Sequence, residues 1–171
     1  MYQKLLLLGL LFLFGTVHKS SAQMPKFKAL FLYNFTQNVD WPTSATSGSE
    51  FIVTVVGDKE MAKELKNLAK VKKVGTKTLV IKEANALKDI ETSHVVFLGS
   101  SKSNLMSQLK SQQANVPVLL ISSKEGLCEQ GAGISFMIAS GKLRYQICEA
   151  NINDQGLQVN SKLLSLGTVV K

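Results

Sequence analysis

The sequence is poor in arginine. Arg144 is the only arginine among its 20 basic residues, and the other basic residues are lysines. Proteins that read nucleic acids depend on the bidentate contacts of arginine with bases and phosphates. We therefore expect no nucleic-acid partner, although the formal net charge is +8. A lysine-rich surface is typical of solubility, and it leaves weak attraction to an acidic partner or a membrane surface open.

Residues that carry out catalysis are equally scarce. The chain after residue 22 has one histidine, His94, at the edge of an apolar segment, where a packed strand-end residue is the ordinary role. One histidine and two cysteines twenty residues apart make no zinc-site spacing. No GxSxG, Walker or strand-linked GxGxxG pattern occurs. We expect no enzymatic activity, no metal site and no cofactor.

Long apolar runs are also absent, except for a short one at the N-terminus. Leu5–Phe14 follows Lys4 and has about ten residues, against the roughly 20 that span a bilayer. Ser20 and Ala22 are small residues at the −3 and −1 positions of a cleavage before Gln23. We interpret residues 1–22 as a secretory signal peptide, cleaved near Ala22/Gln23, rather than as a retained membrane anchor. The predicted location is the periplasm.

The remaining chain has the size of one domain. Residues 23–171 are 149 residues, enough to bury a core of their own. Without Lys4 and Lys19, 18 basic residues remain against 12 acidic ones, a net charge of +6. We expect a single domain over residues 23–171.

Helical and strand-like patterns alternate along this domain. Apolar spacing predicts helices over residues 25–39, 58–70, 84–90 and 102–112, and β-branched runs predict strands over 51–56, 78–81, 94–98 and 116–121. Residues 156–170 predict a short strand and a last helical turn. This order favours an α/β fold, a three-layer sandwich with a mainly parallel sheet.

The pattern changes to an antiparallel hairpin near the C-terminus. Residues 134–139 and 143–147 flank Ser140-Gly141, a sequence that suits a tight turn. This turn places three apolar pairs on one face, which we expect to point toward the core: Ile134 with Ile147, Phe136 with Tyr145, and Ile138 with Leu143. The other face carries Ser135, Met137, Arg144, Gln146 and Cys148. A shift by one residue would mix the two faces, so the pattern predicts this register.

Five segments in order resemble the YfiR family, also called YfiR/HmsC-like. They are ALFLYNFTQNVDWP at 29–42, FIVTVVGD at 51–58, HVVFLGSS at 94–101, GISFMIASGKLRYQI at 133–147 and GLQVNSKLL at 156–164. The resemblance covers essentially the whole chain after the predicted signal peptide.

The resemblance implies a periplasmic α/β protein that is not an enzyme. It implies a regulator of an inner-membrane signalling protein, of the diguanylate cyclase or sensor kinase type, that binds the periplasmic part of its partner. An outer-membrane lipoprotein is a second partner in the best-known case. Cys148 stands where the family hairpin has asparagine. The better-known members have two disulfides, whereas this chain has only two cysteines. Redox behaviour and partner identity are therefore not carried over from the family.

Two groups of residues are candidates for partner contact, because large aromatics, methionine and arginine are enriched at interfaces. They are Tyr33, Asn34 and Trp41 in and after the first helix, and Met137, Arg144 and Gln146 on the hairpin. For Trp41 the alternative is inward packing that seals the helix end, and for Arg144 it is an internal ion pair. A homodimer is left open.

The carboxyl ends of the parallel strands are the alternative site. Open α/β sheets bind ligands at this edge, and six small or acidic residues are expected there: Gly57, Asp58, Ser100, Ser101, Ser122 and Ser123. They would serve a periplasmic small-ligand-binding protein, or they are ordinary turn and cap residues. An exported hydrolase is a third hypothesis, which lacks a nucleophile–base pair.

Cys128 and Cys148 are candidates for a disulfide, which the periplasm permits. In the hairpin register Cys148 lies opposite Gly133, and Cys128 is five residues further, about 17 Å along an extended strand. A disulfide needs Cα atoms within roughly 7 Å. The chain would therefore have to double back near Gly131 and Gly133, and both the bonded and the free form stay open.

Overall fold

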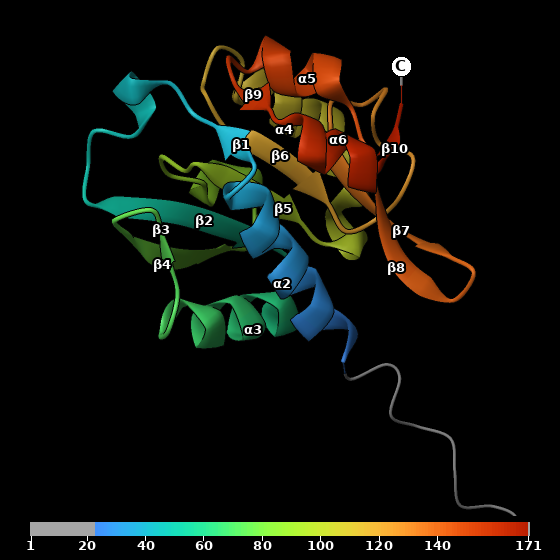
Figure 1. Ribbon diagram of the computed structural model, residues 1–171, viewed down its shortest axis with the longest axis horizontal. Coiled ribbons are helices and arrows are strands. Elements are labelled where there is room, and N and C mark those ends of the chain that lie inside the picture. Colours follow the sequence, from blue (N-terminus) through green and yellow to red (C-terminus); the bar gives the residue numbers. More distant parts are fainter. Residues whose placement is uncertain (1–22, 171) are drawn as a thin grey trace, which may run out of the picture.

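The computed structural model describes residues 23–170, so the predicted signal peptide lies outside the described residues. Its main element is an eight-stranded sheet in the order β10-β8-β7-β6-β5-β2-β4-β3 (Figure 1). The strands are β2 (Glu50–Val56), β3 (Lys73–Val74), β4 (Lys77–Ala84), β5 (Val95–Leu98), β6 (Leu119–Ser122), β7 (Ile134–Ala139), β8 (Lys142–Ile147) and β10 (Thr168–Val169). Five neighbouring strands run parallel to one another: β4, β2, β5, β6 and β7. β8 is antiparallel to β7, and β3 is antiparallel to β4.

Helices cover both faces of this sheet, which confirms the predicted three-layer α/β sandwich. On one face lie α2 (Met24–Thr36), α3 (Lys59–Ala69) and α6 (Ser161–Leu166), and on the other lies α4 (Met106–Gln112) with the short 3₁₀ segments Leu87–Asp89 and Ser100–Leu105. Alternate strand residues supply two cores. In β5, Val95 and Phe97 join the core under α2 and α3, whereas Val96 and Leu98 join the core under α4. Burial on both faces explains why the strand sequences are apolar without alternation.

The first helix is shorter than predicted. Pro25 lies in its first turn, where a missing backbone N–H costs nothing, and the helix ends at Thr36 rather than at residue 39. Val39–Asp40 instead form β1, which pairs antiparallel with β9 (Gln158–Val159) in a separate two-stranded sheet. The Asn38 carbonyl accepts from the Asn160 N–H at 3.1 Å. Pairing with a distant segment thus overrides the local helical spacing.

The predicted helix over residues 84–90 is also wrong. β4 continues to Ala84 because every residue of β2, from Glu50 to Val56, has a partner on it. Only the 3₁₀ turn Leu87–Asp89 follows. The segment after β5 begins with 3₁₀ structure before α4, and the helix α5 (Glu149–Asp154) and the edge strand β10 were not predicted.

The hairpin has the predicted register. Ile134, Phe136 and Ile138 pair with Ile147, Tyr145 and Leu143 in that order. Ser140 and Gly141 both have positive φ, 51° and 71°, as a type I′ turn requires. The expectation that all six face the core is wrong at the tip, where Ile138 is 52% exposed and Leu143 is half-buried. The tip extends beyond the helices that cover the rest of the sheet (Figure 1).

Cys128 and Cys148 form a disulfide, with Cα atoms 5.8 Å apart. The chain doubles back between them, where Gly131 has φ 105° and its N–H donates to the Cys128 carbonyl at 2.8 Å. The Cys148 N–H donates to the Gly133 carbonyl at 2.8 Å, which continues the hairpin ladder by one pair. The bond attaches the loop after β6 to the start of α5.

Candidate docking surface

The first helix and the hairpin border three adjoining hollows. Their volumes are about 280, 320 and 310 Å³. Met24 and Leu143 line the first and the third, and Phe31 lines the second and the third, so the hollows are neighbours on one surface. We call this area the α2–hairpin surface. It consists of Met24, Phe27, Lys28, Phe31 and Asn34 on α2, Met137, Ile138, Lys142, Leu143 and Arg144 on the hairpin, and Lys162 and Leu166 on α6.

Large apolar side chains are exposed on this surface. Phe27 is 47% exposed, Ile138 52% and Leu166 64%. They belong to three separate elements, α2, the hairpin tip and α6, that meet here. Apolar side chains that gather around neighbouring hollows are typical of an interaction site.

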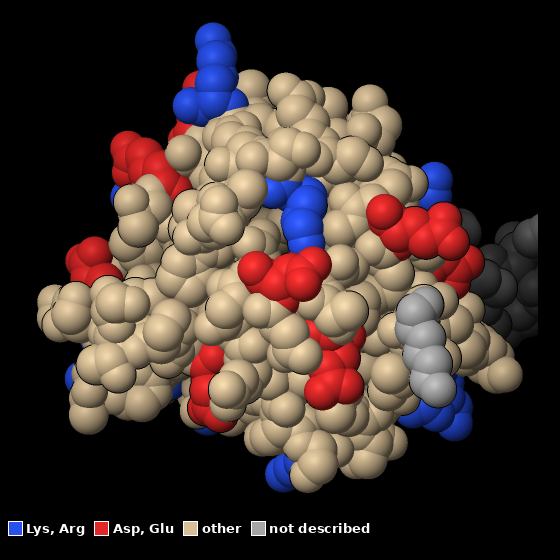
Figure 2. Space-filling model, turned by 90° about the horizontal axis from the view of Figure 1, so that it is seen from above, with Lys and Arg blue, Asp and Glu red and all other residues tan. Residues whose placement is uncertain are grey.

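The charge of the α2–hairpin surface is mostly positive. Lys28, Lys142, Arg144 and Lys162 line the three hollows, against a single carboxylate, Glu125. None of the ion pairs between described residues involves these four cations. The face on the side of α5 differs, since it carries acidic and basic groups interspersed without a continuous basic patch (Figure 2). The surface therefore favours an acidic partner.

Arg144 and Asn34 are brought together by the fold. Both line the second hollow, with Phe31, Lys162 and Leu166 among their neighbours. Arg144 is exposed, and no ion pair within the described chain binds it, so the alternative of an internal ion pair is not what the structure shows. Met137 lines the first hollow. These three candidates share one surface.

Gln146, Tyr33 and Trp41 make internal contacts instead. Gln146 Oε1 accepts from the Gly126 N–H at 2.8 Å and so binds the loop after β6. The Tyr33 hydroxyl donates to the Lys73 carbonyl at 3.0 Å, at the β3 edge of the sheet.

Trp41 packs inward, which is the alternative that the sequence analysis gave to partner contact. Its Nε1 donates to the His94 carbonyl at 3.2 Å, and its ring stands edge-on to Phe51 with centroids 5.0 Å apart. The fold separates Trp41 and Tyr33 from the α2–hairpin surface.

The strand-end candidates do lie together at the carboxyl edge of the sheet, where they bond to one another and to nearby turn and helix atoms. Ser101 Oγ donates to the Gly57 carbonyl at 3.3 Å, and Ser100 Oγ donates to Ser123 Oγ at 3.2 Å. Ser122 Oγ donates to the Lys124 carbonyl at 2.8 Å. Asp58 accepts from the Met61 N–H at 3.0 Å and thereby caps α3 as predicted. Most of these side chains therefore act as ordinary turn and cap residues, the alternative to a ligand site in the sequence analysis.

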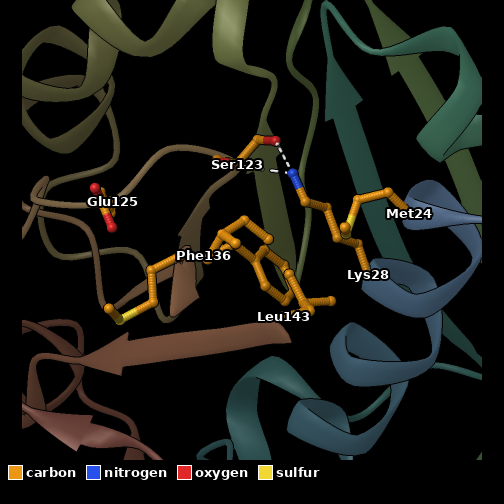
Figure 3. Close-up of a pocket in the computed structure, with 8 residues that line it drawn as sticks. Met24, Lys28, Ser123, Glu125, Phe136 and Leu143 are labelled. Atoms are coloured by element: carbon orange, nitrogen blue, oxygen red, sulfur yellow. Dashed lines mark hydrogen bonds between the residues drawn. The ribbon is translucent and has the colours of Figure 1, made fainter. Parts of the chain in front are cut away.

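Lys28 is the residue at this edge that the sequence did not reveal. Its Nζ donates to Ser123 Oγ at 2.6 Å and lies 5.6 Å from the centroid of the Phe136 ring (Figure 3). One sequence signal points to its position facing the sheet: Lys28 stands three and four residues before Phe31 and Leu32, on the same side of the helix. The sequence alone does not distinguish Lys28 from the many other lysines.

His94 is a packed residue. Its Nδ1 accepts from the Ile52 N–H at 2.9 Å, so its Nε2 carries the proton and donates to the Ala45 carbonyl at 2.9 Å. The ring stacks on Phe51 with centroids 4.5 Å apart. Burial lowers the pKa of His94 below its ordinary value, although the Ala45 carbonyl opposes this. The geometry leaves no free nitrogen for catalysis.

Two further features are missing from the part of the chain that the structure describes. Within residues 23–170, no three histidine, cysteine or acidic side chains are grouped as a metal ion would require. No helix in that range is both long and apolar enough to cross a membrane.

Comparison with known proteins agrees with the predicted resemblance. The family model described as YfiR/HmsC-like matches residues 25–168. The chain belongs to the YfiR/HmsC-like family. Members of this family are periplasmic regulators of signalling proteins. No curated protein matches the sequence.

A solved structure shares the fold. It is the crystal structure of a conserved domain protein from Vibrio cholerae O1 biovar El Tor strain N16961, with a TM-score of 0.56 and 15% sequence identity. The alignment covers 86% of this chain and 60% of that chain. The chain thus spans less than two thirds of the length of this structural neighbour.

Proposed function

We propose that the protein is an exported, non-catalytic regulator that binds the periplasmic part of an inner-membrane signalling protein, of the diguanylate cyclase or sensor kinase type. Membership of a family of periplasmic regulators supports this proposal in general terms. The observation that carries it is the α2–hairpin surface, where exposed apolar side chains lie among cations that have no ion-pair partner in the described chain.

The chemistry of the surface suits a protein partner. Phe27, Ile138 and Leu166 supply apolar anchors, and Arg144 supplies a planar cation for an acidic group. Two copies that met through this surface would place cations against cations, which favours an acidic partner over a homodimer. An outer-membrane lipoprotein that competes for the same surface is a second proposed partner.

Arg144→Ala in the native host tests this function. We expect the variant to be exported, with an N-terminus at or near Gln23 by mass spectrometry, and to keep its melting temperature, since Arg144 is exposed. Capture of the membrane partner from detergent extracts should fall, and the signalling output should change. Lys63→Ala is the matched control, because Lys63 is an exposed cation on α3, outside the α2–hairpin surface.

Either of two results contradicts the proposal. The first is a lowered melting temperature of Arg144→Ala with partner capture intact, which would make Arg144 structural. The second is an equal effect of Lys63→Ala, which would mean that net charge rather than this surface governs binding.

A further inference from the structure

The ammonium group of Lys28 lies inside a pocket rather than in open solvent. Lys28 is half-buried, and its Nζ donates to Ser123 Oγ at 2.6 Å and to the Ser123 carbonyl at 3.3 Å. Ser100 Oγ donates to the same Ser123 hydroxyl at 3.2 Å. The hydrogen-bond partners that Lys28 has within the described residues are therefore two neutral oxygens of Ser123, at the carboxyl end of β6.

Within residues 23–170, no carboxylate lies in ion-pair contact with the Lys28 ammonium group. The ion pairs among residues 23–170 involve other lysines. Burial lowers the pKa of Lys28, and the more distant Asp58 only partly opposes this effect. An ammonium withdrawn from water without a counter-ion costs free energy. An anion bound beside Lys28 would recover part of that cost.

The walls of the pocket combine apolar and polar side chains, and five of the eight lining residues are apolar. It has a volume of about 280 Å³ and is lined by Met24, Phe136, Met137, Ile138 and Leu143 besides Lys28, Ser123 and Glu125. Figure 3 shows Lys28 directed toward Ser123, with Glu125 on the far side of Phe136. The volume is close to the lower end of small-molecule sites, about 300–1,000 Å³. The thioether groups of Met24 and Met137 and the aliphatic side chains of Ile138 and Leu143 suit a hydrocarbon body.

We propose that this pocket binds a small organic monoanion, a carboxylate carried on an apolar body, with the carboxylate on Lys28 and the Ser123 hydroxyl and the body against Met24, Met137 and Ile138. One cation and one hydroxyl satisfy a single carboxylate, and the Glu125 carboxylate disfavours a second negative charge. The pocket is the first hollow of the α2–hairpin surface, so the ligand and the proposed partner would meet on the same surface. The pocket is complete within one chain, so ligand binding can be tested on the purified protein without the partner, and either proposal can fail while the other stands.

Binding of 4-phenylbutyrate to the purified exported protein tests the proposal. The matched probes are 4-phenyl-1-butanol and 4-phenylbutylamine, which keep the apolar body and replace the carboxylate by a neutral and a cationic group. We expect saturable binding of the carboxylate by calorimetry, with NMR shifts of the Met24 and Met137 methyl groups. The alcohol and the amine should bind roughly tenfold or more weakly, because a charged hydrogen bond is lost.

Variants assign the carboxylate to Lys28. Lys28→Met keeps the length of the side chain and should weaken 4-phenylbutyrate binding roughly tenfold or more. Lys26→Met, at an exposed lysine on the same helix, should leave it unchanged. If Lys28→Met does not fold, Ser123→Ala decides, and it should also weaken binding. The proposal is overturned by equal affinities for the carboxylate and the alcohol, by no saturable binding, or by unchanged affinity in the folded variants.

Discussion

Truncation of Phe136 should be among the most destabilising single changes on the hairpin. The side chain is 1% exposed in the core under α2. Its ring centroid lies 5.7 Å from that of Phe35, 6.2 Å from that of Phe31 and 6.3 Å from that of Phe97. Phe136→Ala removes the ring that all three contact, and it leaves a cavity that the surrounding aromatic rings close only in part. The expected loss in the free energy of unfolding is about 3–5 kcal/mol.

The loss is large enough to measure by two methods. For a chain of this size, 1 kcal/mol lowers the melting temperature by about 2–4 °C, so the decrease should be about 6–20 °C. Urea denaturation followed by circular dichroism gives the free energy directly. The purified exported protein is the material for both assays.

Ile138→Ala is the matched control for Phe136→Ala. Ile138 lies two residues further along β7, on the same face, but it is 52% exposed at the hairpin tip. Its truncation should cost less than about 1 kcal/mol. Equal losses from the two variants would refute the conclusion that the core ends between these residues.

Three further changes test other parts of the structure. Reduction of the unfolded protein should raise its thiol titre by the two sulfurs of Cys128 and Cys148. The reduced protein should have a free energy of unfolding about 3 kcal/mol lower than the oxidised protein. Equal thiol titres before and after reduction would contradict the disulfide. The free energy of unfolding should fall as the pH falls from about 6.5, the ordinary pKa of histidine, to the lower pKa of His94 in the folded protein, because only the unfolded chain binds the extra proton over this range. Urea titrations across this range should show a weaker pH dependence for His94→Gln. Identical pH profiles for the two proteins would exclude His94 as the cause. Gly167→Ala should lower the free energy of unfolding by about 1–3 kcal/mol, because its Cβ would clash with the Tyr145 ring. Gly48→Ala should leave the melting temperature unchanged, because no atom lies within 4 Å of its Cβ. A similar melting temperature for the two alanine variants would argue against the Gly167 contact.

Features set by local sequence were predictable. The hairpin register depends on Ser140-Gly141 and on the separation of apolar from polar residues, and both are visible in the sequence. The N-cap of α3 is likewise predictable, because an acidic side chain precedes an apolar helix. Parallel strands buried on both faces are recognisable from their continuous apolar runs.

Features set by distant partners were not predictable. The apolar spacing favours a helix through Val39, but the chain leaves it to pair with Val159, 120 residues away. The helix predicted to begin at Ala84 is replaced by strand because β2 offers a partner up to Val56. In the site, Lys28 resembles any surface lysine until the fold places Ser123 and Phe136 beside it.

The hairpin separates stability from the proposed recognition along its own length. Its inner pairs, Ile134 with Ile147 and Phe136 with Tyr145, are buried and bind the sheet to α2 and α6. Its outer residues, Ile138 and Arg144, reach past that cover into the hollows of the α2–hairpin surface. Substitutions at the tip can therefore alter what the protein binds at little cost to the fold, whereas substitutions at the inner pairs cannot.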